Sequence, residues 1–89
     1  MTNVHNDEKL SVVIPAYNAQ HRIERCIKSV LKAMREQDEL IIVNDGSTDH
    51  TADIVKMNSD RRIRLVEQVN SGVSAARNNG IENAGGDLI

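Results

Sequence analysis

The residues best suited to chemistry stand in one short stretch, "IIVNDGSTDHT", which covers residues 41 to 51. Its apolar start is followed at once by Asn44, Asp45, Gly46 and Ser47. A buried strand that ends this way brings a carboxylate, a flexible backbone and the start of a helix to one rim, which suits a polar ligand with hydrogen-bond donors and phosphates. The same residues are also ordinary in turns and helix caps, so a purely structural role stays open.

The elements that must position this stretch are predicted from the spacing of the apolar residues. Aliphatic and β-branched runs predict strands at residues 10–14, 39–43 and 63–68, and "DLI" at 87–89 begins a fourth. Apolar residues three and four apart predict helices at 20–36, 51–58 and 73–84. Residues 1–9 read as a flexible polar start. This order predicts an α/β fold, a parallel βαβαβαβ Rossmann-like sheet covered by helices.

The predicted helices each have an inward face. The side chains expected there are Ile23, Ile27, Val30, Leu31 and Met34, then Ala52, Ile54, Val55 and Met57, then Val73, Ala76, Gly80, Ile81 and Ala84. Cys26 lies on the first of these faces and is expected to be buried. Ser47, Thr48 or Asp49 is expected to cap the second helix. The charged residues around 59–64 are expected to form a solvated turn.

The composition limits the possible partners. With 89 residues the chain is one small domain, and 39% hydrophobic and 27% charged residues indicate a globular one. A net charge of -2 gives no general reason to bind nucleic acid or an anionic membrane. The single cysteine excludes an internal disulfide, and the apolar runs are too short to span a membrane. A cytoplasmic location is therefore expected.

Several common site motifs are missing from the sequence. It contains no GxGxxG, no GxxxxGK[ST] and no GxSxG. His5, His21 and His50 have no metal-ligand spacing with one another or with Cys26, so surface positions are expected for them. Because ligands of open parallel sheets bind beyond the carboxyl ends of the strands, the candidate loops are "PAYN", "NDGSTD" and "QVNSG".

Five ordered blocks connect these loops to a known family. "SVVIPAYNAQ", "CIKSVL", "ELIIVNDGSTDHT", "NSGVSAARNNGI" and "AGGDLI" resemble the start of a family 2 glycosyltransferase with the GT-A fold, over residues 10–89. The resemblance implies a hexosyltransferase-type enzyme that uses a nucleotide-diphosphate sugar, usually UDP-linked. The sugar would pass to an acceptor hydroxyl in polysaccharide or glycoconjugate synthesis. Asn44 departs from the commoner Asp-Asp form of the motif but keeps a hydrogen-bonding oxygen.

The resemblance also implies roles for particular residues. Pro15, Ala16 and Tyr17 would border the base and ribose, and Asp45 would accept a hydrogen bond from the base. Arg77 would approach the nucleotide or its phosphates. Structural alternatives are a strand stop at Pro15, a packed ring at Tyr17 and a helix-surface ion pair at Arg77.

The family's DxD motif, which binds Mn²⁺ or Mg²⁺, is expected shortly after the strand begun by "DLI", and Asp87 is not part of it. No catalytic or metal-binding residue is therefore predicted here, and the chain alone is expected to lack transferase activity. The sheet is expected to be a truncated GT-A domain that could self-associate, and the full-length protein could lie at the inner face of the membrane. Two other readings remain: a non-catalytic nucleotide-binding or assembly module, and a sugar nucleotidyltransferase, for which "PAYN" lacks the expected glycines and lysine.

Overall fold

Strands and helices alternate along the whole described part of the chain, which in this computed structural model is residues 8–88. The elements are β1 (Leu10–Ala16), α1 (Ile23–Ala33), β2 (Glu39–Asp45), α2 (Thr51–Lys56), β3 (Ile63–Gln68), α3 (Val73–Asn83) and β4 (Asp87–Leu88). All strand pairs are parallel, in the order β3-β2-β1-β4. The predicted parallel α/β sheet is confirmed. Residues 1–7, which include His5, and Ile89 lie outside the described residues.

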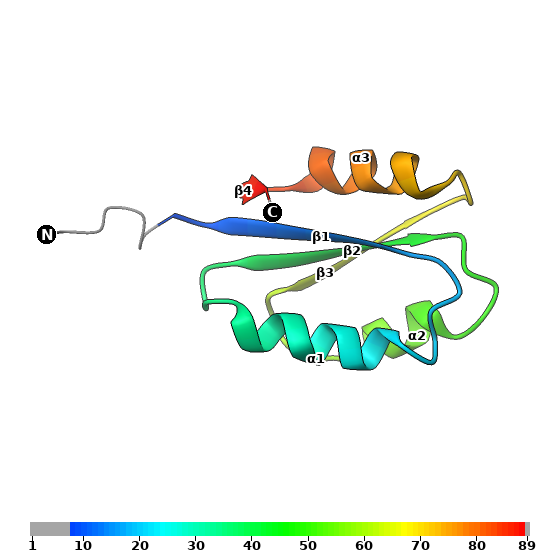
Figure 1. Cartoon of the computed structure of the whole chain (residues 1–89), viewed down its shortest axis with the longest axis horizontal. Helices are drawn as coiled ribbons and strands as arrows, with labels where there is room; N and C mark the ends of the chain where they lie inside the picture. Colours follow the sequence, from blue (N-terminus) through cyan, green and yellow to red (C-terminus); the bar gives the residue numbers. More distant parts are fainter. Residues whose placement is uncertain (1–7, 89) are drawn as a thin grey trace, which may run out of the picture.

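The sheet lies between two helical layers. Helix α3 covers one face, and α1 with α2 covers the other (Figure 1). The central strand β2 is buried on both sides because its side chains alternate between the layers. Leu40 and Ile42 pack in the cluster under α1, while Ile41 and Val43 pack with Ala76 of α3. Two small aliphatic cores on either side of β2 therefore hold the fold together.

Helix α3 packs very close to the sheet, and a glycine makes this possible. A Cβ atom added at Gly80 would overlap Cγ1 of Val13 and lie 3.2 Å from Cγ2 of Val43. Since these are core side chains with no room to withdraw, the helix can approach the sheet only with glycine at this position.

Helix α1 is shorter than predicted, covering residues 23–33 instead of 20–36. Met34 takes an extended conformation, and Nη1 of Arg62 donates hydrogen bonds to the carbonyl oxygens of Leu31 and Met34, both at 3.2 Å. The guanidinium thus adds hydrogen bonds to carbonyl groups at the end of the helix, where the oxygen of Leu31 also accepts the N–H of Met34. The prediction of a solvated turn at 59–64 is wrong for Arg62, whose side chain is only 18% exposed.

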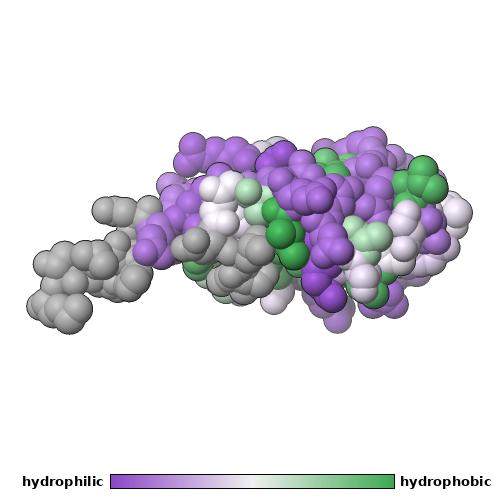
Figure 2. Space-filling model, turned by 90° about the horizontal axis from the view of Figure 1, so that it is seen from above, coloured by the Kyte–Doolittle hydropathy of each residue, from purple (hydrophilic) through white to green (hydrophobic). Residues whose placement is uncertain are grey.

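Some predicted inward positions are also wrong. Met57 is 81% exposed because α2 ends at Lys56, and Val73 and Ile81 are 56% and 41% exposed. Ala76 and Gly80 of α3 are buried, as predicted, because only a narrow stripe of small residues faces the sheet. Seen from the α3 side, the surface is mostly hydrophilic with separate hydrophobic patches (Figure 2).

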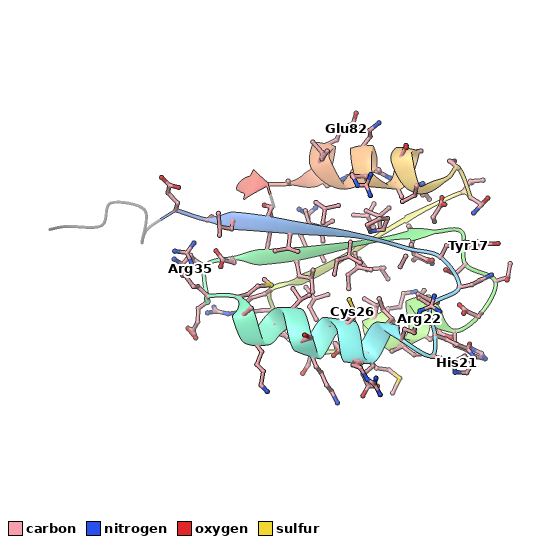
Figure 3. All side chains as sticks on the ribbon, in the orientation of Figure 1. Tyr17, His21, Arg22, Cys26, Arg35 and Glu82 are labelled. Atoms are coloured by element: carbon pink, nitrogen blue, oxygen red, sulfur yellow. The ribbon has the colours of Figure 1, made fainter. Side chains whose placement is uncertain are left out.

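Two smaller predictions concern helices α1 and α2. Cys26 is half-buried, so its predicted burial is only partly met; its side chain projects from α1 toward the sheet (Figure 3). The prediction that Ser47, Thr48 or Asp49 caps α2 is wrong, because the N-cap residue is His50, which makes no side-chain capping hydrogen bond. Asp49, one residue earlier, accepts the backbone N–H of Thr51 at 3.0 Å and also its hydroxyl through Oδ1. This carboxylate satisfies one of the N–H groups that the first turn of the helix leaves free.

Candidate functional site

The carboxyl ends of three strands lie side by side at one edge of the sheet. The strand register pairs Ala16 with Asn44 and Asp45 with Gln68, so β1, β2 and β3 end at the same level. The loops that follow them meet at the end of the molecule opposite to the start of β1 and to β4 (Figure 1). We call this the carboxyl edge. It is the place where the sequence predicts a ligand.

A pocket of about 290 Å³ opens at the carboxyl edge. Its lining residues are Pro15, Ala16, Tyr17, Asp45, Asn70, Gly72 and Val73. Four of the five predicted site residues are therefore brought together, and Arg77 is not among the lining residues. The volume is close to the lower end of the range for small-molecule sites, roughly 300 Å³. It suits one part of a ligand, such as a ring system, rather than a whole nucleotide sugar.

Asp45 accepts hydrogen bonds from four groups at this edge, and it is only 4% exposed. Its Oδ1 accepts hydrogen bonds from Nε2 of Gln68 at 2.8 Å and the backbone N–H of Ser71 at 2.7 Å. Its Oδ2 accepts from the backbone N–H of Gly72 at 3.0 Å and Nδ2 of Asn70 at 3.3 Å. These donors, the Gln68 side chain first, hold the pKa of Asp45 below its usual value. The carboxylate therefore fixes the loop of residues 68–72 in the wall of the pocket.

The loop after β2 packs backbone against backbone on the loop after β3. Gly46 has φ +68°, and a Cβ atom added there would lie 2.6 Å from the backbone nitrogen of Asn70. Both its conformation and its surroundings thus require glycine. Beside it, Oδ1 of the buried Asn44 accepts the backbone N–H of Ser47 at 3.2 Å. In this turn Asn44 uses only the oxygen that asparagine shares with aspartate.

Asn18 connects the loop after β1 to the loop after β2. It has a left-handed φ of 47°; its backbone N–H donates to Oγ of Ser47 at 2.9 Å, and its Oδ1 accepts the N–H of Thr48 at 2.8 Å. These bonds hold the adjacent Tyr17, which is 50% exposed, at the rim of the pocket (Figure 3). The sequence reasoning missed both Asn18 and Asn70. The signal in the sequence was an asparagine just beyond each of two strand ends.

Arg77 is exposed on α3, one helical turn after Val73. With the side chains described for residues 8–86 it forms no ion pair, so the helix-surface salt bridge that the sequence left open is not found among them. Its position past the pocket leaves the guanidinium accessible to solvent and to ligands.

A larger hollow of about 580 Å³ lies at the opposite edge of the sheet, beside the start of β2. Its lining is almost entirely charged. Within it, Glu39 forms ion pairs with Lys9 at 3.6 Å and with Arg64 at 3.7 Å. Since ligands of open parallel sheets bind at the carboxyl ends of the strands, size alone does not make this hollow the site.

A family model shows what the chain is related to. The model of glycosyl transferase family 2 matches residues 11–89. The chain belongs to this family. The resemblance drawn from the five sequence blocks is thereby confirmed.

Curated relatives of this glycosyl transferase family 2 chain include three bacterial proteins. It is 40% identical over 85 residues to glycosyltransferase GlyA of Streptococcus pneumoniae, covering 93% of this chain and 12% of the relative. It is 41% identical to the uncharacterized glycosyltransferase YibD of Escherichia coli, covering 97% and 26%. It is 42% identical to the uncharacterized glycosyltransferase EpsJ of Bacillus subtilis, covering 90% and 24%. The chain thus spans about an eighth to a quarter of the length of these relatives.

Solved structures show the same fold. TarS residues 1–349 of S. aureus match with a TM-score of 0.79 and 29% identity, over 91% of this chain and 26% of that one. A mannosyltransferase of Pyrobaculum calidifontis, solved with GDP-Man and Mn²⁺, matches with a TM-score of 0.79 and 27% identity, over 89% and 25%. The predicted GT-A fold is confirmed by these neighbours.

The described residues of this family 2 chain do not fit a metal site. The side chains described for residues 8–86 contain no group of three histidine, cysteine or acidic residues that could hold a metal ion. The Asp45 carboxylate is surrounded by N–H donors, and these are not metal ligands. Over the same residues, no helix is both long and apolar enough to cross a membrane.

Proposed function

We propose that this family 2 chain is the nucleotide-binding part of a glycosyltransferase. The enzyme would transfer a sugar from a nucleotide-diphosphate sugar, UDP-linked, to an acceptor hydroxyl in polysaccharide or glycoconjugate synthesis. One observation supports this most: Pro15, Ala16, Tyr17 and Asp45 line one pocket at the carboxyl edge of the sheet. Proteins with open parallel sheets bind their ligands at this edge.

The pocket has the character of a nucleoside site. Pro15 and Ala16 offer apolar surface, and the half-exposed ring of Tyr17 offers a face on which a base or ribose can lie. Asp45 contributes by fixing the opposite wall, the loop of residues 68–72. In this arrangement the base enters between the loops after β1 and β3.

The diphosphate would then lie toward α3. Helix α3 begins at Val73, in the pocket lining, and its N-cap residue Gly72 supplies no side-chain hydrogen bond. The free N–H groups and positive dipole of such a helix end favour phosphate. Arg77, one turn further along the helix, would add a positive charge beside the phosphates.

A divalent metal is part of this proposal for the whole enzyme. The mannosyltransferase neighbour binds GDP-Man together with Mn²⁺. Such an ion neutralises the charge of a leaving diphosphate when it is bound. Because the side chains described for residues 8–86 offer no metal-binding group, the contacts proposed for this chain are those to the base, the ribose and, through α3, the phosphates.

Calorimetric titration of the protein with UDP, with and without Mn²⁺ or Mg²⁺, tests the proposal. We expect UDP to bind without metal, and we expect Tyr17→Ala to weaken binding of both UDP and uridine. Arg77→Ala should weaken UDP but not uridine, because uridine has no phosphates. Arg61→Ala is the matched control, since Arg61 is also an exposed arginine but lines the opposite edge of the sheet. Absence of UDP binding, or equal losses for Arg77→Ala and Arg61→Ala, would contradict the proposal.

A further inference from the structure

The outward face of helix α1 is basic. Residues 22–33 contain four basic side chains and one acidic one, so this segment has a charge of +3 while the whole chain has -2. Three of the basic residues and one serine recur at intervals of three and four residues, which places them on one helical face. We call this row the basic stripe: Arg22, Arg25, Ser29 and Lys32.

The basic stripe faces solvent, and its charges have no partner in the protein. All four of its side chains are exposed, whereas Ile23 and Ile27 on the other side of the helix are buried in the core. Its three basic residues form no ion pair with the side chains described for residues 8–86. Glu24, the acidic residue of the helix, pairs with Lys28 at 2.9 Å, outside the stripe. Three positive charges are therefore available to an external partner.

A hollow of about 450 Å³ opens along the same helix. Arg22, Arg25 and Ser29 of the basic stripe line it, and the half-buried Cys26 and Val30 give it an apolar part. Figure 3 shows Arg22 and Cys26 near the start of α1. Cationic groups beside an apolar hollow match a partner that is itself amphipathic, with an anionic head and an apolar body.

An anionic lipid surface matches these features better than other anionic partners. The stripe is straight and roughly 15 Å long, because each helical residue adds 1.5 Å. A protein that encloses an amphipathic helix would need its apolar face, which is buried here. Nucleic acid offers phosphates but no apolar part for the hollow. Lipid head groups offer both, and a basic side chain close to an anionic membrane strengthens binding about fivefold.

We propose that the basic stripe and its hollow are a docking surface for a membrane that contains anionic phospholipids, with α1 lying on the head groups and not inserted between them. This inference does not depend on the proposed function. Arg22 also lines a second hollow, of about 390 Å³, together with Tyr17 at the rim of the nucleotide pocket. A membrane docked on α1 would therefore lie next to the carboxyl edge.

Co-sedimentation of the protein with vesicles tests this proposal. The vesicles consist of phosphatidylcholine alone or with about one third phosphatidylglycerol, which is anionic. We expect binding only to the anionic vesicles, and we expect its loss when NaCl is raised from about 0.05 to about 0.5 M. Arg25→Gln should weaken binding about fivefold, and Arg22→Gln combined with Arg25→Gln about twenty-fivefold.

Arg61→Gln is the matched control, because Arg61 is also an exposed arginine but lines the opposite edge of the sheet. It changes the net charge as Arg25→Gln does and should weaken binding less than about twofold. Equal losses for the two variants would overturn the proposal, and so would equal binding to both kinds of vesicle or none to the anionic ones. Displacement by glycerol phosphate beyond that by NaCl of equal ionic strength would also overturn it, since it would indicate a site for a soluble phosphate.

Discussion

The central strand β2 begins and ends with a buried carboxylate, and the two carboxylates are satisfied by different partners. Glu39 at the start, 6% exposed, lies 3.6 Å from Nζ of Lys9 and 3.7 Å from Nη1 of Arg64. It also accepts hydrogen bonds from Oγ of Ser11 and the N–H of Gly85. Asp45 at the end is held by neutral amide donors alone.

This difference separates a structural edge, at the start of β2, from the carboxyl edge, which we propose is the binding edge. At the start of β2 two cations balance the charge of Glu39, and Ser11 in turn accepts the N–H of Gly86 at 2.9 Å, which joins β4 to the sheet. At the end of β2 the charge of Asp45 is balanced only by dipoles of a loop that also lines a pocket.

The largest expected effect on UDP affinity comes from removing the Asp45 carboxylate at the binding edge. Asp45→Ala leaves two side-chain and two backbone donors without their acceptor, so the loop of residues 68–72 should lose its fixed form. UDP affinity, measured by calorimetry, should fall by about a hundredfold or more. An unchanged affinity would remove Asp45 from the site.

Removing the carboxylate at the structural edge should lower stability without changing UDP affinity. Glu39→Ala removes the acceptor of the Ser11 hydroxyl and of the Gly85 N–H, together with the carboxylate paired with Lys9 and Arg64. The free energy of unfolding in urea should therefore fall by about 1–3 kcal/mol. UDP affinity of the folded protein should not change. Glu36→Ala is the control, because its ion pair to Arg61 is exposed on both sides and contributes at most about 1 kcal/mol. A loss of UDP binding in Glu39→Ala would mean that the two edges are coupled.

Substitutions at two glycines of the binding edge distinguish the cost of backbone strain from the cost of losing close packing. Gly46→Ala meets both an unfavourable φ and the backbone of Asn70, so stability should fall by about 1–3 kcal/mol and UDP binding should weaken. Gly72→Ala meets an unfavourable φ of +97° but nothing within 4 Å, so the loss should be smaller, about 1 kcal/mol. Urea unfolding and calorimetry measure both quantities. Equal losses for the two variants would show that packing on Asn70 is unimportant.

The smallest effect concerns pH. The side-chain hydrogen bond from Arg35 lowers the pKa of Asp38 to about 2, and the Arg62 side chain does the same for Asp60. Since the ordinary value is 3.8, these groups stabilise the fold fully above that pH, and this contribution is lost as the pH falls toward 2. Urea midpoints between pH 6 and pH 2.5 should therefore decrease on acidification, and less steeply in Asp38→Asn. A midpoint independent of pH would contradict this.

Much of the fold could be predicted because hydrophobic spacing is local information. The runs at 39–43 and 63–68 gave two of the strands, although β2 extends to Asp45 because its polar last residues continue the pairing with β1 and β3. The end of α1 could not be predicted, since Arg62, about thirty residues further along the chain, caps it. Sequence spacing also could not show that α3 buries only a stripe of small residues.

The sequence by itself determined the order of strands and helices, and with it the edge at which Pro15, Ala16, Tyr17 and Asp45 meet. Periodicity fixes each element, and parallel connections send the carboxyl ends of the strands to one side. Only the tertiary structure decided what Asp45 does there. Its four donors lie 23 to 27 residues away along the chain, and hydrogen bonds over such separations exist only after the strands have paired and the loops have met.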